Sequence, residues 1–515
     1  MKVKFLLMFF IAIGIQHTYG QTSSEALRYS MFRPYSTSRA IGVGNSMSAL
    51  GGDFSAIAIN PAGIGLYRKS DAYVSMGTIW EKNEARLNSD QHQNSIFEEN
   101  TGKFSLNGLG FVGVSNPIAS DWQNVNVSIN LVRTADFRRD IYFKGRSRGS
   151  ITDRFLELAL DPLGQGLEGL HPDDLDDFEA GLAYETGALF DTGTDSLKYI
   201  YNTDFLAYPE YAVLKEQSVK QYGGMHEFTF GVGANYREWM ALGLSLHIPF
   251  GFFESSTVYT ESEAIKNEYL PFRSLVFENK LKTEISGVGA KMGIILKPTP
   301  FLRLGAAIQT PYLLTLKDKY HTSLEYGFVL NNRDTLFDAR SPDGEFEYRL
   351  TTPWRSVFSV ALIGTYGFIS GEVDWINPQQ AHYNLSAFSD DAGDTSFEQE
   401  LNADIDKQYK SVMQYRLGAE LALSKLRLRA GSQWLPQTYT NSDEQEHYYS
   451  FGGGYRGDKI YFDFAYSFGK QNQSYAPYLT GNSDFNGDGK IDAVTPLVNQ
   501  NINRVEILFT IGWKI

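Results

Sequence analysis

The sequence predicts an all-β protein, a fourteen-stranded antiparallel transmembrane β-barrel, and three observations support this prediction. Many short segments carry apolar residues at every second position, which is typical of strands with one apolar face. The connections between these segments are alternately long and short along the chain. After the first twenty residues, no segment approaches ~18 consecutive apolar residues, which excludes membrane-spanning helices.

The composition narrows the class of protein before any motif is considered. The chain has 515 residues, a formal net charge of −14, no cysteine and an aromatic content of 14%. An acidic chain of this kind is not expected to bind nucleic acid. Because it has no cysteine it forms no disulfide, so its stability must come from burial or from a closed sheet. A large soluble all-β protein and an outer-membrane barrel both fit these values.

Residues 1–20 have the features of a signal peptide for export. Two lysines precede a short apolar run over residues 5–15, and the small residues Thr18 and Gly20 suit a cleavage site. The mature chain is then expected to begin at Gln21. The alternative is a membrane anchor, but the apolar run is too short to span a bilayer.

The direction of the alternation distinguishes a membrane barrel from a soluble sandwich. In NVNVSINL, residues 124–131, the apolar residues share one face and the polar residues share the other. The last strand, residues 504–515, repeats the pattern with larger apolar residues. In a sandwich the apolar faces look inward. Here the faces opposite the large apolar residues carry small and charged residues such as Arg416 and Glu420, which predicts lipid outside and a polar lumen.

The spacing of the segments predicts the strand count. Strands are expected to begin near residues 71, 103, 123, 225, 239, 278, 302, 354, 368, 411, 426, 445, 459 and 503. Long connections fall near residues 83–102, 135–224, 261–277, 319–353, 376–410, 437–444 and 471–502, and the others are short turns such as Asn116-Pro117. Short turns on the periplasmic rim and long loops outside are typical of bacterial outer-membrane barrels.

The barrel is expected to occupy residues 71–515, as a monomer surrounded by outer-membrane lipid. Its last strand ends with apolar residues at alternate positions, which resembles the signal read by the barrel-assembly machinery, although Ile515 replaces the usual aromatic residue. The long insertion near residues 135–224 is predicted to form short amphipathic helices over the outer mouth. These helices could capture hydrophobic ligands, or they could only cover apolar residues of the lumen.

Residues 21–70 precede the first strand and contain a broken apolar segment, GGDFSAIAINPAGIGLYR, from Gly51 to Arg68. Pro61 stops a helix or a central strand from continuing through it. The spacing Asp-x-Ser-Ala-x-x-x-Asn-Pro-Ala-Gly, from Asp53 to Gly63, resembles the N-terminal hatch of the FadL/TodX family. Members of this family are outer-membrane transporters of long-chain fatty acids and other hydrophobic compounds.

The resemblance implies a barrel that is plugged by residues 21–70 and takes up hydrophobic small molecules passively. Ligand would enter from outside and leave after the hatch rearranges, sideways through an opening in the wall. A wide lumen must be filled or it leaks, and small residues let a plug approach the wall closely. The break at residues 60–63 could move, or it could be a static turn. The expected hatch and gating residues are Gly51, Gly52, Asp53, Ser55, Asn60, Pro61, Ala62 and Gly63.

A second hypothesis keeps the fold and changes the role. The chain could be a non-transporting barrel that acts as a surface binding or secretion scaffold and resembles the PorV component of type IX secretion. Three arginines predicted to face the lumen, Arg416, Arg427 and Arg429, are candidates for contact with a ligand carboxylate. The alternative for each arginine is a salt-bridge network within the wall.

DFNGDGKIDAVT, residues 484–495, follows the spacing of a calcium-binding loop. The expected ligands are Asp484, Asn486, Asp488 and Asp492. Thr495 replaces the usual bidentate glutamate, so the alternatives are an incomplete structural calcium site and an Asp/Gly-rich turn. No cofactor is required. The motifs GxSxG and HExxH and a phosphate-binding loop are absent, so an enzyme is not expected.

Overall fold

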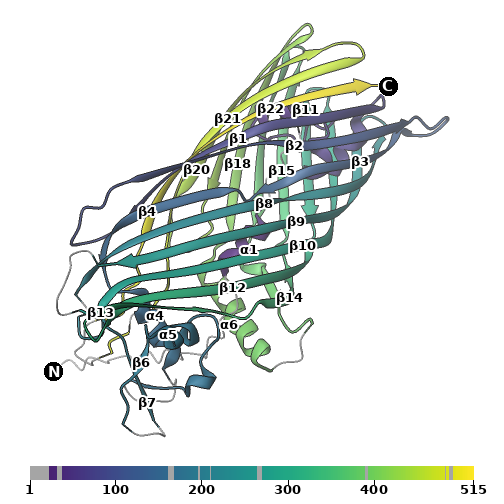
Figure 1. Cartoon of the computed structure of the whole chain (residues 1–515). Coiled ribbons are helices and arrows are strands. Elements are labelled where there is room, and N and C mark those ends of the chain that lie inside the picture. Colours follow the sequence, from purple (N-terminus) through teal and green to yellow (C-terminus); the bar gives the residue numbers. More distant parts are fainter. Residues whose placement is uncertain are drawn as a thin grey trace, which may run out of the picture.

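The computed structural model describes residues 23–31, 37–160, 167–194, 198–208, 210–263, 270–388, 392–442, 444–481, 483–485 and 491–515, so the expected signal peptide lies outside them. One large sheet closes on itself, because β1 (Asp71–Leu87) pairs with β2 (Phe97–Ser115) on one side and with β22 (Val498–Lys514) on the other. Both of these pairings are antiparallel. The sheet forms a closed barrel (Figure 1).

The remaining strands of the wall and its hairpins follow in chain order. They are β3 (Trp122–Asp136), β4 (Arg139–Arg148), β8 (Ala212–Tyr236), β9 (Met240–Ser262), β10 (Phe272–Thr299), β11 (Leu302–Gln309), β12 (Leu313–Leu330), β13 (Arg333–Arg340), β14 (Gly344–Thr351), β15 (Arg355–Gly364), β16 (Gly367–Ile376), β17 (His382–Asn384), β18 (Val412–Leu423), β19 (Leu426–Pro436), β20 (Gln445–Arg456) and β21 (Ile460–Tyr475). The wall has fourteen strands, as the sequence predicts, because β3 with β4, β11 with β12, β14 with β15 and β16 with β17 each occupy one position, and β13 is the arm of a hairpin on β12. β8 and β10 begin at Ala212 and Phe272, before their predicted starts near 225 and 278, because their outer ends also pair with neighbouring strands.

Helices and small strands lie in the lumen or at the rim with the long loops. The helices are α1 (Ser23–Ser30), α2 (Ser38–Gly42), α3 (Ser55–Ile59), α4 (Ile151–Ala159), α5 (Ala180–Thr186) and α6 (Ala392–Gln408), with the 3₁₀ turns η1 (Pro61–Leu66), η2 (Pro172–Asp174) and η3 (Pro378–Gln380). The small strands are β5 (Glu168–Gly169), β6 (Phe190–Asp191) and β7 (Tyr199–Asn202). Of the described helices, none is both long enough and apolar enough to cross a membrane.

Two wall strands are interrupted at prolines, which cannot donate to a sheet ladder. Pro311 separates β11 from β12, and Pro353 separates β14 from β15. The two breaks are neighbours, because Tyr312 N donates to Thr352 Oγ1 (2.8 Å) and Thr352 N donates to Tyr312 O (3.0 Å). The threonine hydroxyl therefore replaces a main-chain acceptor, and the wall stays joined across both prolines.

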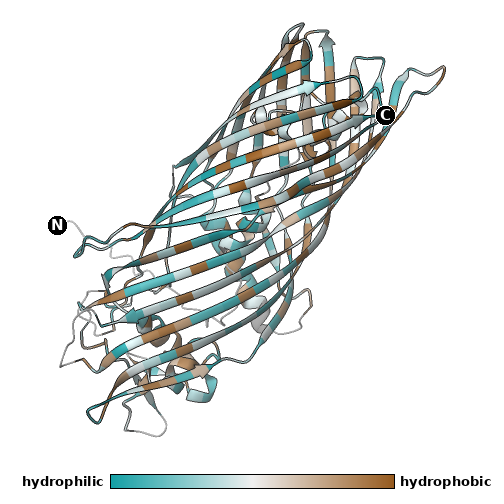
Figure 2. Cartoon of the chain, turned by 45° about the horizontal axis from the view of Figure 1, so that its top comes forward, coloured by the Kyte–Doolittle hydropathy of each residue, from teal (hydrophilic) through white to brown (hydrophobic). Residues whose placement is uncertain are grey.

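The side chains of the wall follow the predicted alternation, with apolar residues outside and polar residues inside. In β22, Phe509 and Trp513 are 51% and 41% exposed, whereas Glu506 and Thr510 are 5% and 1% exposed. Figure 2 shows hydrophobic and hydrophilic residues alternating along the strands. This inside-out distribution is that of a barrel surrounded by lipid.

The two rims of the barrel differ as the connections predict. The C-terminus lies at one rim, with the short turns, and we call it the periplasmic rim because short turns face the periplasm in outer-membrane barrels. Helices α4 and α5 lie at the opposite, outer rim (Figure 1). We call the described residues between 149 and 211 the cap. The predicted insertion at 135–224 is longer than this cap, because β4 and the first part of β8 pair with each other in the wall.

Candidate functional site

Residues 37–67, which we call the lumen segment, are almost entirely buried inside the barrel. Side chains of the wall donate hydrogen bonds to its main-chain carbonyls. Asn126 Nδ2 donates to Ile64 O (2.7 Å) and to Tyr67 O (2.9 Å), and Lys291 Nζ donates to Ala58 O (2.5 Å). Carbonyls that are buried without such partners would be costly, so the wall is built to receive this irregular backbone.

Two glycines in the wall allow the lumen segment to touch the main chain of the barrel. A Cβ atom on Gly243 would overlap the main chain of Pro61 and Ala62, and a Cβ atom on Gly293 would overlap Asn60 Oδ1. Any larger residue at either position would push the segment away, so close approach explains both glycines. The Asn-Pro-Ala-Gly break is therefore one of the points at which segment and wall are tightly fitted, as Val43 and Gly44 are against Gly418 and Gly431.

The first half of the predicted hatch motif forms a turn held by one carboxylate. Asp53 Oδ1 accepts hydrogen bonds from Ser55 N (3.0 Å), Ser55 Oγ (2.7 Å) and Thr37 Oγ1 (2.8 Å). Gly51 and Gly52 both have a φ of 62°, which glycine adopts without strain. The aspartate therefore joins Thr37, the residue before α2, to Ser55, the first residue of α3.

The second half of the motif is the break itself. Asn60 is fully buried and caps η1, because its Oδ1 accepts from Ala62 N (3.1 Å), and Pro61 is the first residue of that turn. Asn60 Nδ2 donates to Ser48 O (2.8 Å) and to Ile294 O of the wall (3.3 Å). A Cβ on Gly63 would lie 2.9 Å from Gly51 Cα, so the two predicted glycine sites pack together.

Charged side chains also join the lumen segment to the wall. Arg39 Nε lies 3.3 Å from Glu420 Oε2, and Ser48 donates to Glu372 Oε2 from both its N (3.1 Å) and its Oγ (2.5 Å). Arg303 of the wall donates to Leu50 O. The segment is thus held by ion pairs and polar hydrogen bonds as much as by apolar contact.

The three predicted arginines all carry carboxylate partners within the wall. Arg416 contacts Glu372 (2.7 Å) and Asp374 (2.9 Å). Arg429 contacts Glu420 (2.7 Å) and Asp463 (2.7 Å), and Arg427 Nε lies 3.8 Å from Glu420. Of the three, Arg416 lines the cavity described below, whereas Arg427 and Arg429 do not. The geometry is that of the wall network that the sequence left as the alternative.

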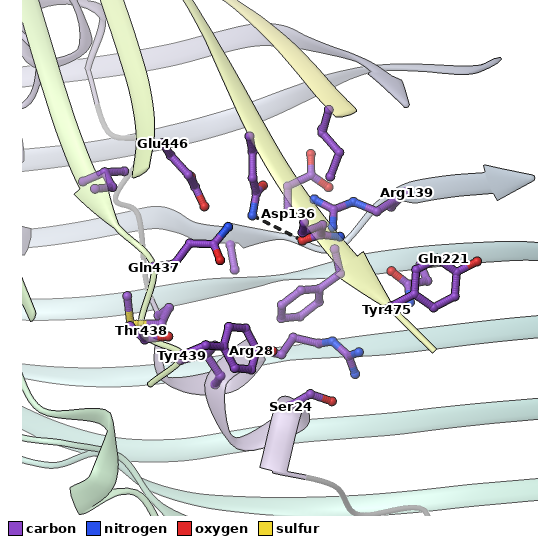
Figure 3. A pocket seen from close by; sticks show the side chains of 18 of the residues that line it. Ser24, Arg28, Asp136, Arg139, Gln221, Gln437, Thr438, Tyr439, Glu446 and Tyr475 are labelled. Atoms are coloured by element: carbon purple, nitrogen blue, oxygen red, sulfur yellow. Dashed lines mark hydrogen bonds between the residues drawn. The ribbon is translucent and has the colours of Figure 1, made fainter. Parts of the chain in front are cut away.

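A cavity of ≈850 Å³ lies in the barrel between the lumen segment and the outer half. The lumen segment contributes Ala58 and Ile59 to its lining, and α1 contributes Leu27 and Arg28. Figure 3 shows residues of α1 facing the cavity together with Gln221, Gln437 and Tyr475 from the wall and the outer loops. The lining is mixed, because apolar and aromatic residues lie beside amides and ion pairs. A cavity of this size and concavity suits a small molecule.

Helix α1 is packed against the wall beside this cavity, and the sequence did not reveal it. Tyr29 is fully buried, and its ring meets those of Phe137 and Phe253 edge-on, with centroids 5.9 Å and 6.5 Å away. The Arg28 guanidinium lies 4.0 Å from the centre of the Phe253 ring. The helix SSEALRYS is too short and too polar for its periodicity to be read from the sequence.

The wall contains a seam, which we define as the gap in main-chain pairing between residues 97–107 of β2 and the β3–β4 edge. Within the described residues, the β2–β3 ladder covers only residues 108–115 of β2. Side chains cross the seam instead: Arg133 Nη1 donates to Ser105 Oγ (2.6 Å), and Arg138 Nη1 donates to Gly102 O (3.2 Å). At its outer end, Asn94 Nδ2 donates to Arg146 O (3.0 Å).

The cap is built around an apolar core rather than around polar contacts. Phe155, Leu156 and Leu189 are fully buried in a cluster that also includes Phe143 and Leu324 of the wall. Helix α4 begins after Ser150, whose Oγ and the following N–H both donate to the carboxylate of Glu261 on β9 (2.5 Å and 3.0 Å). Burial raises the pKa of Asp153, in the first turn of α4, to about 7. The cap is therefore a packed body anchored on the outer ends of the wall strands.

The predicted calcium loop is described only in part. Asn486 and Asp488 lie outside the described residues, whereas Asp484 and Asp492 lie within them. Asp492 Oδ2 accepts a hydrogen bond from Phe485 N (3.0 Å). Across the described part of the chain, no group of three or more histidines and acids is placed to hold a metal ion.

A buried serine, histidine and glutamate form a hydrogen-bonded chain that sequence motifs could not locate. Ser245 Oγ lies 2.7 Å from His247 Nε2, and His247 Nδ1 lies 2.6 Å from Glu227 Oε1. Of these three residues, Glu227 lines the cavity, whereas Ser245 and His247 are 2% and 0% exposed and do not. The serine has no path to a substrate in this arrangement, so the chain of bonds supports the wall.

Comparisons with known proteins agree with this architecture. No protein-family model matches the chain, and no curated protein matches it. Among solved structures, a Pseudomonas aeruginosa FadL homologue is similar at a TM-score of 0.53 and 13% identity, covering 94% of this chain and 99% of that one.

Two toluene transporters are also similar to the chain. Ralstonia pickettii TbuX has a TM-score of 0.45 and 12% identity, covering 93% of this chain and 98% of its own, and P. putida TodX has a TM-score of 0.46 and 10% identity, with the same coverage. At such identities a likeness establishes fold and not ligand. The chain therefore has an outer-membrane β-barrel fold similar to that of the P. aeruginosa FadL homologue.

Proposed function

We propose that the protein is a passive channel for uptake of hydrophobic or amphipathic small molecules across the outer membrane of a Gram-negative bacterium, and not an enzyme. The observation that carries this proposal is the position of the ≈850 Å³ cavity, which lies in the lumen directly beside the buried segment 37–67. A wide barrel needs a filled lumen to prevent leakage, and the buried segment fills it. A cavity on the outer side of this segment can hold a ligand before the ligand crosses the membrane.

The lumen segment acts as the hatch in this proposal. Ligand enters past the cap, binds in the cavity, and leaves through the seam between β2 and the β3–β4 edge. The seam is suited to this role because it is bridged by a few side-chain hydrogen bonds, whereas β1 and β22 beside it are joined by a main-chain ladder along their whole length. To open the seam, only side chains have to exchange hydrogen-bond partners, and no main-chain hydrogen bonds between strands have to break. The signal peptide directs export, and the barrel-assembly machinery inserts the mature chain.

The test is uptake of a hydrophobic probe after the seam is filled. Ser105 lies at the seam, on the face of β2 that looks inward, and Leu106 on the same strand is 40% exposed toward lipid. We expect Ser105→Trp to lower uptake of radiolabelled dodecanol, an uncharged hydrophobic probe, by tenfold or more in cells that depend on this barrel. The matched control, Leu106→Trp, should keep uptake within twofold of the native chain. Equal uptake by both variants would exclude the seam as the exit.

A further inference from the structure

The cavity is lined by an unusual number of uncharged amides. Nine glutamines take part in its lining, and they come from β8, β11, β18, β19, β21, β22 and the loop after β19. Several of them are almost completely buried, including Gln217 (3% exposed), Gln414 (5%) and Gln500 (2%). Burial of an amide is unfavourable unless both its donor and its acceptor are paired, so a cavity of this kind is built for a polar occupant.

The positively charged residues of the same cavity already form ion pairs with carboxylates or hydrogen bonds with main-chain carbonyls. Arg139 contacts Glu81 (2.9 Å), Arg504 contacts Glu506 (2.8 Å), and Lys291 donates to Ala58 O (2.5 Å). Each of the eight arginines and lysines in the lining has such a partner among the described residues. A ligand carboxylate would therefore have to displace an existing partner, at a cost in free energy.

Three of the nine glutamines form a connected row on the neighbouring strands β21 and β22. Gln471 Nε2 donates to Gln473 Oε1 (3.3 Å), and Gln473 Nε2 donates to Gln500 Oε1 (2.6 Å). The row ends at Gln500 Nε2, which is buried and has no hydrogen-bond partner among the described residues. Beside the row, Tyr475 OH donates to Gln217 Oε1 (2.8 Å). The row thus lines the cavity with hydrogen-bonded amides beside an aromatic ring, and its last donor, Gln500 Nε2, is unused and has almost no exposed surface in this arrangement.

From these observations we infer that the cavity recognises the head group of a neutral, hydroxyl-bearing amphipathic molecule, of the class of alkyl glycosides. A hydroxyl group both donates and accepts hydrogen bonds, as an amide does, and it carries no charge that the paired ions would oppose. A pure hydrocarbon would make no hydrogen bond with these amides. A carboxylate only accepts hydrogen bonds, so it would offer no donor to their carbonyl oxygens. The aromatic rings and α1 then contact the alkyl chain. This inference rests on the proposed uptake function and specifies its substrate class.

The experiment compares probes that share an eight-carbon chain and differ in the head group. Octyl glucoside and octanoate, each below its micelle concentration, and toluene as a headless hydrocarbon, are titrated calorimetrically into the full chain in lipid nanodiscs, with empty nanodiscs subtracted. We expect octyl glucoside to bind at least tenfold more tightly than octanoate or toluene. The double variant Gln473→Leu, Gln500→Leu should weaken glucoside binding by tenfold or more and change octanoate binding by less than twofold.

The matched control is Gln123→Leu, since Gln123 is exposed on β3 and is not part of the lining. If octanoate or toluene binds as tightly as the glucoside, or if the control weakens the glucoside equally, the inference is wrong, although uptake of other hydrophobic molecules can persist. If none of the three probes binds, both the inferred head-group specificity and the proposed uptake function are wrong. Should the double variant not assemble, as judged by heat-dependent gel migration, Gln500→Leu alone replaces it with the same expected direction.

Discussion

At the periplasmic end of the barrel the lumen is filled by a segment held by charged and polar contacts together with several small apolar clusters, whereas at the outer end it is covered by a cap built on one large apolar core. The lumen segment meets the wall at Gly243 and Gly293 and pairs Arg39 with Glu420. The cap buries Phe155 and Leu156 against the wall strands. Both closures use apolar and polar contacts with the wall, but the proportion differs: polar contacts have a larger share in the lumen segment and apolar contacts in the cap.

The difference indicates which closure is able to move. Polar and ionic contacts can be exchanged for water or for a ligand group with little net change in free energy, because each partner finds a replacement. An apolar core has no such replacement, since exposing it costs free energy in proportion to its area. We therefore expect the lumen segment to rearrange during transport while the cap stays folded.

Removal of the lumen segment should have the largest effect. Deletion of residues 38–68 removes nearly all of the buried filling, so the barrel should become permeable to small polar solutes such as monosaccharides. Liposome swelling with the purified barrel measures this permeability, and the native chain is the reference. A deletion variant that folds, as shown by heat-dependent gel migration, and still does not leak would mean that residues 38–68 do not occlude the lumen.

A single substitution at the contact between the segment and the wall should have an intermediate effect. Valine at position 243 cannot coexist with Pro61 and Ala62 in their present places, so Gly243→Val should displace the break and produce a partial leak. The control is Gly371→Val on β16, where a Cβ would lie at an ordinary 3.4 Å from Leu417 Cδ2. Swelling rates that are equal for the two variants would show that the contact at Gly243 does not hold the segment in place.

Truncation of the cap core should have the smallest effect on permeability, although it lowers local stability. Phe155→Ala removes a fully buried ring and should reduce the stability of the cap by about 3–5 kcal/mol. Faster trypsin cleavage within residues 149–211, followed by mass spectrometry, measures this loss. The control is Leu158→Ala on the same helix, where the side chain is only partly buried. This variant should be cleaved more slowly than Phe155→Ala. An increase in liposome swelling for Phe155→Ala would contradict the assignment of the lumen barrier to residues 37–67.

The sequence by itself determined the barrel, its strand count and its two rims. The alternation of apolar and polar residues and the positions of turn residues are local properties of the sequence. They can therefore be recognised without knowledge of tertiary contacts. The same holds for the break at Pro61, which the structure shows as the start of η1. Alternation also predicted that Arg416 and Arg429 point inward, because their neighbours on the strands are apolar and face lipid.

Only the tertiary structure decided which residues meet. Gln217, Gln414, Gln473 and Gln500 are far apart in the sequence and share one cavity because closure of the sheet brings their strands around a common lumen. The seam depends on the register at which β2 and β3 stop pairing, and α1 and α6 depend on the wall that they pack against. Register and packing arise from the closed sheet as a whole, which is why no single stretch of sequence contained them.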